Sequence, residues 1–159
     1  MFNYKKWADE RALSAARLIN VIQFFEQINF IRQQLNHLVL VEENFKARLL
    51  GDKEPHSENN TEIIPALDYL IIRVNDSNRW YQDYISNLSK DDLNEQVYFK
   101  FVDGKIGSMS KLEILFHIVN HSTYHRGAIG RALDMAGGLR PADTYTVFIH
   151  QAEPQRREI

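Results

Sequence analysis

The chain has 159 residues, an ordinary length for one domain and enough to bury an apolar core without covalent crosslinks. Its 19 basic and 21 acidic residues leave a net charge of -2, so electrostatics give no reason to expect nucleic acid or a membrane as a partner. The absence of cysteine excludes disulfides, thiolate metal sites and a cysteine nucleophile.

The first residues form an amphipathic segment instead of an apolar signal core, and no apolar run reaches membrane length. We therefore expect a cytoplasmic protein with a single domain over residues 1–159. Apolar side chains recur at helical spacing in residues 3–24, 26–50 and 65–88, which predicts three long helices. A polar connection that begins at Gly51 separates the second helix from the third, and we expect its His56 to face solvent.

The pattern changes in residues 97–109, where Asp103-Gly104 suits a tight turn and predicts a short hairpin or an extended loop. Ser110 and Glu113 have the spacing of a capping box, so a fourth helix should span about 111–136 before two glycines. The tail is expected to pack across the helices through its apolar residues, which are Tyr145, Val147, Phe148 and Ile149.

Three histidines, His117, His121 and His125, follow one another at four-residue spacing in the fourth helix, and His37 lies in the second. Residues i and i+4 share a helix face, so two neighbouring imidazoles can bind one ion. At about 1.5 Å per residue, His117 and His125 lie roughly 12 Å apart along the axis, too far to share it. The spacing therefore leaves two pairs open, and His121 belongs to both.

A third histidine from a facing helix would complete a set of three neutral nitrogen ligands with an open coordination position. This arrangement is typical of a catalytic divalent site, because structural zinc normally has four protein ligands. The alternative is that the histidines form a polar network in the core and bind no metal.

Residues 120–127 read N-H-S-T-Y-H-R-G and resemble the N-H-x-x-x-H-R-G signature of the DinB/YfiT-like family, which is named for a DNA-damage-inducible protein. Residues 35–37, L-N-H, are similar to the family's second helix, and residues 4–8 are similar to its aromatic start. The resemblance implies an all-α, antiparallel four-helix bundle that forms homodimers. It also implies His37, His121 and His125 as ligands of a divalent metal. We expect zinc, with nickel as the other candidate.

The resemblance leaves several neighbouring residues to be interpreted. Ala128 stands where many members of the family carry glutamine, so a contact from that position is expected to be missing. We expect His117 to serve as a core residue or to support the ligands, and Gly127 to permit close helix contact. Arg126 points about 100° away from the ligand face, so pairing at the surface or between helices competes with substrate binding.

A three-histidine site suits two reactions of a small-molecule substrate. One is metal-assisted hydrolysis, and the other is transfer of a low-molecular-weight thiol, whose pKa the ion would lower. Hydrolysis normally needs a general base, but Glu42 and Glu43 should lie on a solvated face, and Asp68, Asp76 and Asp83 are unspecific. Thiol transfer is therefore slightly favoured. The alternative is a stress-response binding module in which the metal is structural or absent.

Overall fold

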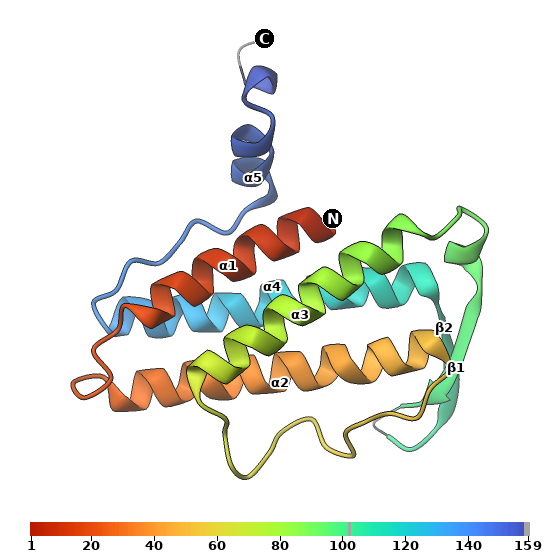
Figure 1. The fold of residues 1–159 in the computed structure, drawn as a ribbon, viewed down its shortest axis with the longest axis horizontal. Helices are drawn as coiled ribbons and strands as arrows, with labels where there is room; N and C mark the ends of the chain where they lie inside the picture. The colour runs from red at the N-terminus through yellow and green to blue at the C-terminus, as the bar shows by residue number, and fades with distance from the viewer. Residues whose placement is uncertain (102, 158–159) are drawn as a thin grey trace.

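The computed structural model describes residues 1–101 and 103–157. This part of the chain contains five α-helices and one two-stranded sheet (Figure 1). In chain order the elements are α1 Phe2–Arg17, α2 Phe25–Leu50, α3 Leu67–Ser86, β1 Gln96–Lys100, β2 Ile106–Ser110, α4 Lys111–Met135 and α5 Tyr145–Ala152. Short 3-10 turns lie at Asp92–Asn94 and Pro154–Arg156. The fold is therefore mostly helical, as expected.

The four long helices, α1 to α4, pack side by side, and α5 projects away beyond α1 (Figure 1). Both α1 and α2 contact α3 and α4, so the four helices enclose a common interior. Among the described residues, no helix combines the length and the apolar character that a bilayer span requires.

The hairpin form of the segment before α4 is confirmed. Strands β1 and β2 pair antiparallel from Gln96 opposite Ser110 to Lys100 opposite Ile106. Gly104 takes a φ of 85°, which is the left-handed conformation that the turn requires. Val102, which the predicted hairpin includes, lies outside the described residues. The sheet contacts α2 and α4 at one end of the molecule.

The predicted ends of α2 and α4 are confirmed by their caps. Gly51 ends α2 with a φ of 72°. The Ser110 side chain accepts a hydrogen bond from the backbone N–H of Glu113, and the Glu113 carboxylate accepts one from the backbone N–H of Ser110. This reciprocal capping box fixes where α4 begins, and with it the position of the histidines along the helix.

The first helix ends seven residues earlier than the predicted residue 24, at Arg17. Its continuation fails at Asn20, whose side-chain oxygen accepts hydrogen bonds from the backbone N–H groups of Ile22 and Gln23. Asparagine offers the backbone this local alternative to a helix. Ile22, which the helical pattern placed on the apolar stripe, is 95% exposed.

The prediction that the tail packs across the helices is wrong. Among the long helices, α5 packs mainly against α1, where the rings of Tyr145 and Phe148 lie 5.4 and 5.9 Å from the ring of Tyr4. None of the residues of α5 is buried. A helix of eight residues with one apolar side gains too little burial to displace the contacts among the long helices.

The apolar core consists of two clusters separated by a polar layer. One cluster contains residues such as Leu13, Ile31 and Leu133, and the other contains residues such as Phe45, Tyr81 and Ile118. On α1, α3 and α4, buried polar side chains stand between the residues of the two clusters, and on α2 they lie on either side of the point where the clusters meet. They are Lys5, Asp9, Asn36, Glu42, Asn44, Ser77, Asn78, Ser122 and Arg126. The three candidate ligands occupy the same level.

Candidate metal centre

The structure brings His37 of α2 together with His121 and His125 of α4. The Nε2 atom of His121 lies 3.2 Å from Nε2 of His37 and 3.1 Å from Nε2 of His125. One ligand atom of each residue lies within 4.8 Å of the others. Two nitrogens bound at about 2.1 Å to one tetrahedral ion are roughly 3.4 Å apart, so the spacing suits a shared divalent ion.

The outer nitrogens of two of these histidines are held by acceptors. The backbone carbonyl of Asn59 accepts a hydrogen bond from Nδ1 of His37 at 2.8 Å, and Oε1 of Gln34 accepts one from Nδ1 of His125 at 2.7 Å. A neutral imidazole that donates through Nδ1 carries its lone pair on Nε2. Both Nε2 lone pairs therefore point toward the same centre, which is the usual support for metal-binding histidines.

His121 occupies the most enclosed position of the three. Its Nδ1 is buried and has no hydrogen-bond partner among the described residues. Burial lowers the pKa of His121 to about 3 and that of His125 to about 4, with neighbouring imidazoles adding to the effect. The two side chains are therefore neutral near pH 7, which is the form that binds a metal ion.

His117, one turn before His121, stands beside the cluster of ligand atoms and not within it. Its ring lies 5.0 Å from the ring of Phe45 and 5.4 Å from that of His121. Burial and the charge of Arg48 lower the pKa of His117. Together with His37, this side chain lines a neighbouring recess.

The recess beside the histidines has a volume of about 300 Å³ and mostly apolar walls. Its lining includes His37 and His121, and the aromatic rings come from both α2 and the hairpin, from Phe45, Phe99 and Phe101. Arg48 lies over two of these rings, 4.6 Å from Phe45 and 4.2 Å from Phe99. The hairpin therefore closes one side of a cavity that the helices leave open.

The connection between α2 and α3 runs along α2 and helps to fix the site. The Asn44 side chain exchanges two hydrogen bonds with the backbone of His56. Asn36 donates to Thr61, and the carbonyl of Asn59 reaches His37. The solvent-facing interpretation of His56 is wrong, because its ring is half-buried and hydrogen-bonded to Glu43.

Neither glutamate near His37 faces solvent freely, contrary to prediction. Glu42 is fully buried and pairs with Lys5 at 2.8 Å. Both carboxylate oxygens of Glu43 accept hydrogen bonds from the guanidinium of Arg73, at 2.9 and 2.6 Å. Partial burial would raise the pKa of Glu43, but the contacts with Arg73 and His56 outweigh this effect and lower it. Both carboxylates are thus engaged in structural contacts.

Lys5 is the centre of the buried ionic layer. Its ammonium group lies 2.8 Å from Asp9, 2.8 Å from Glu42 and 2.7 Å from the Asn78 oxygen. Burial alone would raise the pKa of Asp9, but Lys5 and Arg126 outweigh that effect and lower it. For Glu42, burial dominates and raises the pKa. The layer joins α1, α2, α3 and α4 behind the histidines.

Arg126 pairs between elements and is buried, so its surface interpretation is wrong. The guanidinium lies 2.8 Å from Asp9 of α1 and 2.7 Å from Asp143, which follows α4.

The expected close helix contact at Gly127 is absent, since a methyl group there would meet nothing within 4 Å among the described residues. Close approach occurs instead at Gly130, where Arg140 passes 2.8 Å from the position of a Cβ.

The three aspartates of α3 offer no base for the site. Asp68 pairs with Arg17 and Asp76 with Arg79 at the surface, and Asp83 is exposed.

The sequence does contain one signal for the buried ionic layer. Lys5 and Asp9 are four residues apart and lie on the same side of α1 as the apolar Ala12.

Comparison with known proteins identifies the family. A model of the DinB family matches residues 1–158. The protein DinB of Bacillus subtilis (strain 168) is 22% identical over 170 residues, which cover 98% of this chain and 95% of that protein. A DinB-like protein from Bacillus cereus ATCC 10987, known from a crystal structure, shares the fold with a TM-score of 0.53 and 16% identity, over 88% of this chain and 91% of that one. The chain belongs to the DinB family.

Proposed function

We propose that the protein binds one divalent metal ion, zinc in the cell, through Nε2 of His37, His121 and His125, and that it is a metal-dependent enzyme. The observation that supports this most directly is the convergence of three Nε2 atoms, two of whose lone pairs are directed inward by hydrogen bonds from Nδ1. The framework would be an antiparallel four-helix bundle, and the lack of cysteine is compatible with a cytoplasmic location.

A divalent ion at this position would supply positive charge that lowers the pKa of a bound thiol or water. The protein's own residues would provide the rest. Asn59 and Gln34 hold two imidazoles in the tautomer that binds, and the rings of Phe45 and Phe99 give the recess an apolar wall. Arg48 pairs with Glu54 at 2.8 Å, and its remaining N–H groups would attract an anionic group of a small substrate.

Thiol transfer fits the recess better than hydrolysis does. Among the described residues that line it there is no carboxylate to serve as a general base, and Glu42 and Glu43 are held in ion pairs. A metal-bound thiol is activated by loss of its own proton and needs less assistance from the protein. The thiol must come from solution because the chain contains no cysteine.

A non-catalytic stress-response module with a structural metal is the competing function. The open recess beside His37 and His121 favours catalysis over that function, because a structural site is normally closed by a fourth protein ligand. His117, the residue nearest in sequence that could close it, packs against Phe45 and lies outside the set of converging atoms.

Two measurements test the proposal, first of metal content and then of thiol turnover. Protein purified without nickel affinity should contain about one ion per chain by elemental analysis. The content should be lost in His37→Ala, His121→Ala and His125→Ala and retained in His117→Ala, the matched control from the same helix. Loaded protein should then consume glutathione or cysteine against a panel of small electrophiles. A full complement of metal without thiol-dependent or hydrolytic turnover would favour the structural alternative.

We also propose that the protein forms a homodimer. Four large apolar side chains on α4 are exposed on the isolated chain, and at 100° per residue they spread over about 140° of the helix: Leu112, Phe116, Tyr124 and Met135. A second copy could cover them. Sedimentation should give twice the mass of the chain, and Phe116→Glu should reduce it to a monomer without changing metal content. A monomer over the whole concentration range would refute this assembly.

A further inference from the structure

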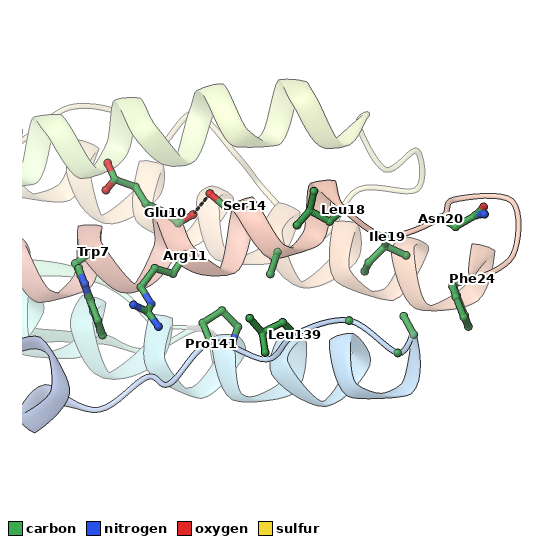
Figure 2. A pocket seen from close by; sticks show the side chains of 14 residues that line it. Trp7, Glu10, Arg11, Ser14, Leu18, Ile19, Asn20, Phe24, Leu139 and Pro141 are labelled. Atoms are coloured by element: carbon green, nitrogen blue, oxygen red, sulfur yellow. Dashed lines mark hydrogen bonds between the residues drawn. The ribbon is translucent and has the colours of Figure 1, made fainter.

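A second cavity lies on the opposite side of α1 from the ionic layer, between this helix and the chain that follows α4 (Figure 2). Its volume is about 560 Å³, within the range of small-molecule sites. Trp7 and Arg11 stand at one end of it, Ile19 and Phe24 at the other, and Leu139 and Pro141 form the facing wall. None of the three converging histidines lines this cavity.

The polar end of the cavity is lined by Glu10 and Arg11, and only the Arg11 side chain is directed toward the facing wall. The Arg11 guanidinium carbon lies 4.6 Å above the Trp7 ring, and Figure 2 shows both side chains directed toward the chain segment that holds Pro141. Oε1 of Gln151 accepts a hydrogen bond from Nε1 of Trp7 at 3.0 Å and a long one from Nη1 of Arg11 at 3.5 Å. This contact with α5 holds the Trp7–Arg11 stack in place.

Most of the hydrogen-bonding capacity of Arg11 is unused. Among the described residues, no carboxylate forms an ion pair with Arg11, and its Nε is buried without a hydrogen-bond partner. The neighbouring Glu10 carboxylate is turned the other way in Figure 2, and its ion-pair partner is Lys6. A guanidinium prefers a planar, two-oxygen anion such as a carboxylate.

The rest of the cavity is suited to an aliphatic chain. Leu18 and Leu139, which line it, are 86% and 84% exposed, an unfavourable state for two leucines on facing walls. From Arg11 to Leu18 the helix rises about 11 Å, which matches an acyl chain of roughly eight to ten carbons.

We propose that this cavity is a binding site for a medium-chain carboxylate, with the carboxylate on Arg11 and the acyl chain between Leu18 and Leu139. Charge complementarity selects an anionic amphiphile over a neutral one, and the length of the apolar part selects the chain. The site is separate from the histidines and binds its ligand whether or not a metal is present.

Octanoate is the probe, and the emission of Trp7 reports its binding. The chain has two tryptophans, Trp7 and Trp80, and Trp80 lies on α3. The measurements therefore use the Trp80→Phe variant, in which all tryptophan emission comes from Trp7. We expect saturable binding of octanoate, confirmed by calorimetry, with weaker binding of butyrate and of 1-octanol. Higher salt should weaken the binding of octanoate and not that of 1-octanol, because only the former uses a charge.

Two variants separate the charge from the apolar wall. Arg11→Met keeps the apolar stem and should weaken octanoate about tenfold while leaving 1-octanol unchanged. Arg17→Met, an exposed arginine of the same helix, is the matched control and should bind like the parent. Leu139→Glu, at an exposed position where folding is not at risk, should weaken both ligands.

Three results would overturn the proposal. They are the absence of saturation by octanoate, equal affinity in Arg11→Met and the parent, and a dimer that Leu139→Glu dissociates. In the last case a second copy of the chain, and not a small carboxylate, covers the cavity. Circular dichroism of each variant verifies that the helices are intact, and metal content measured in parallel tests the histidine site separately.

Discussion

Lys5 and Lys6 are neighbours in α1, but their ammonium groups have different surroundings. Lys5 is fully buried between Asp9 and Glu42, whereas Lys6 is half-buried and 3.9 Å from Glu10. Lys5→Met would leave two buried carboxylates short of a cation, and we expect a loss of about 3–5 kcal/mol in the free energy of unfolding. Lys6→Met should change it by less than about 0.5 kcal/mol. Urea unfolding at pH 7 compares them, and equal values would show that the layer contributes little.

The carboxyl group of Asp9 should make stability depend on pH. Lys5 and Arg126 lower its pKa below the usual 3.8, against the opposing effect of burial. A lowered pKa in the folded state gives a stabilisation that is complete above the unfolded-state value and is lost as the pH falls through the folded-state value. The difference in unfolding free energy between the wild type and Asp9→Asn should therefore be constant from pH 7 to about 5 and shrink below about pH 4.

Glu42, whose pKa is raised by burial and in part by the charge of Asp9, acts in the opposite direction. Because Asp9→Asn would change the pKa of Glu42, both proteins of this comparison also carry Glu42→Gln. Chemical denaturation at a series of pH values gives the required differences. A difference that remained constant down to pH 2 would contradict the assignment of Asp9 as the ionised partner of Lys5 and Arg126.

At the scale of single residues, the sequence predicted which histidines come together, but it did not predict which charged side chains are buried. Spacing left two histidine pairs open on α4, since any i, i+4 pair has the same local geometry, and the family signature selected His121 with His125. The burial of Glu42 and Arg126 could not be predicted, because each depends on partners in α1 that only the folded chain places beside it. A charged residue without a visible partner is normally assigned to the surface.

At the scale of elements, the capping box of α4 provides a test of what fixes the last long helix. Ser110→Ala removes the acceptor for the backbone N–H of Glu113, and we expect a loss of about 1 kcal/mol in the free energy of unfolding. Ser108→Ala, in the same strand but exposed and outside the cap, should be nearly neutral. Urea titration followed by circular dichroism measures both. A similar loss in the two variants would attribute the effect to the strand and not to the cap.

The elements that the sequence predicted correctly are those with local end signals. Gly51 and the pair Ser110 and Glu113 mark helix ends through their own backbone and side-chain chemistry, so their positions needed no tertiary information. The end of α1 was missed because its apolar spacing continues past Asn20, while the side chain of that residue favours a turn. The position of α5 depends on aromatic contacts with Tyr4, which no local pattern reveals.

At the scale of the whole molecule, the histidines and the ionic layer lie between two apolar clusters. This arrangement depends on how far each helix is shifted along its neighbours. Ser122 shows the connection: it follows His121 in α4, and its hydroxyl donates to Glu42 of α2 at 3.0 Å. The ionic layer is therefore hydrogen-bonded to the residue that follows the candidate ligand His121. Helical periodicity alone leaves the relative shift of the helices undetermined, so the sequence predicted four helices but not this alignment.

Metal binding should stabilise the molecule as a whole, since the converging histidines come from α2 and α4. His37 and His121 are 84 residues apart in the chain, so the unfolded protein does not present them together. An ion that binds mainly the folded state raises the free energy of unfolding by about 4 kcal/mol at roughly 1,000 times its dissociation constant. We expect this gain for zinc in wild type and in His117→Ala, compared with protein in a chelator.

His125→Ala should show almost no gain, because two remaining histidines bind zinc much more weakly than three do. Chemical unfolding with zinc and with chelator measures each gain as a difference within one protein, so any loss of stability from the substitution itself cancels. If His125→Ala gained as much as wild type, zinc would be bound elsewhere. If neither gained, the convergence of the three Nε2 atoms would reflect a polar network in the core, and catalysis through a metal would have to be abandoned.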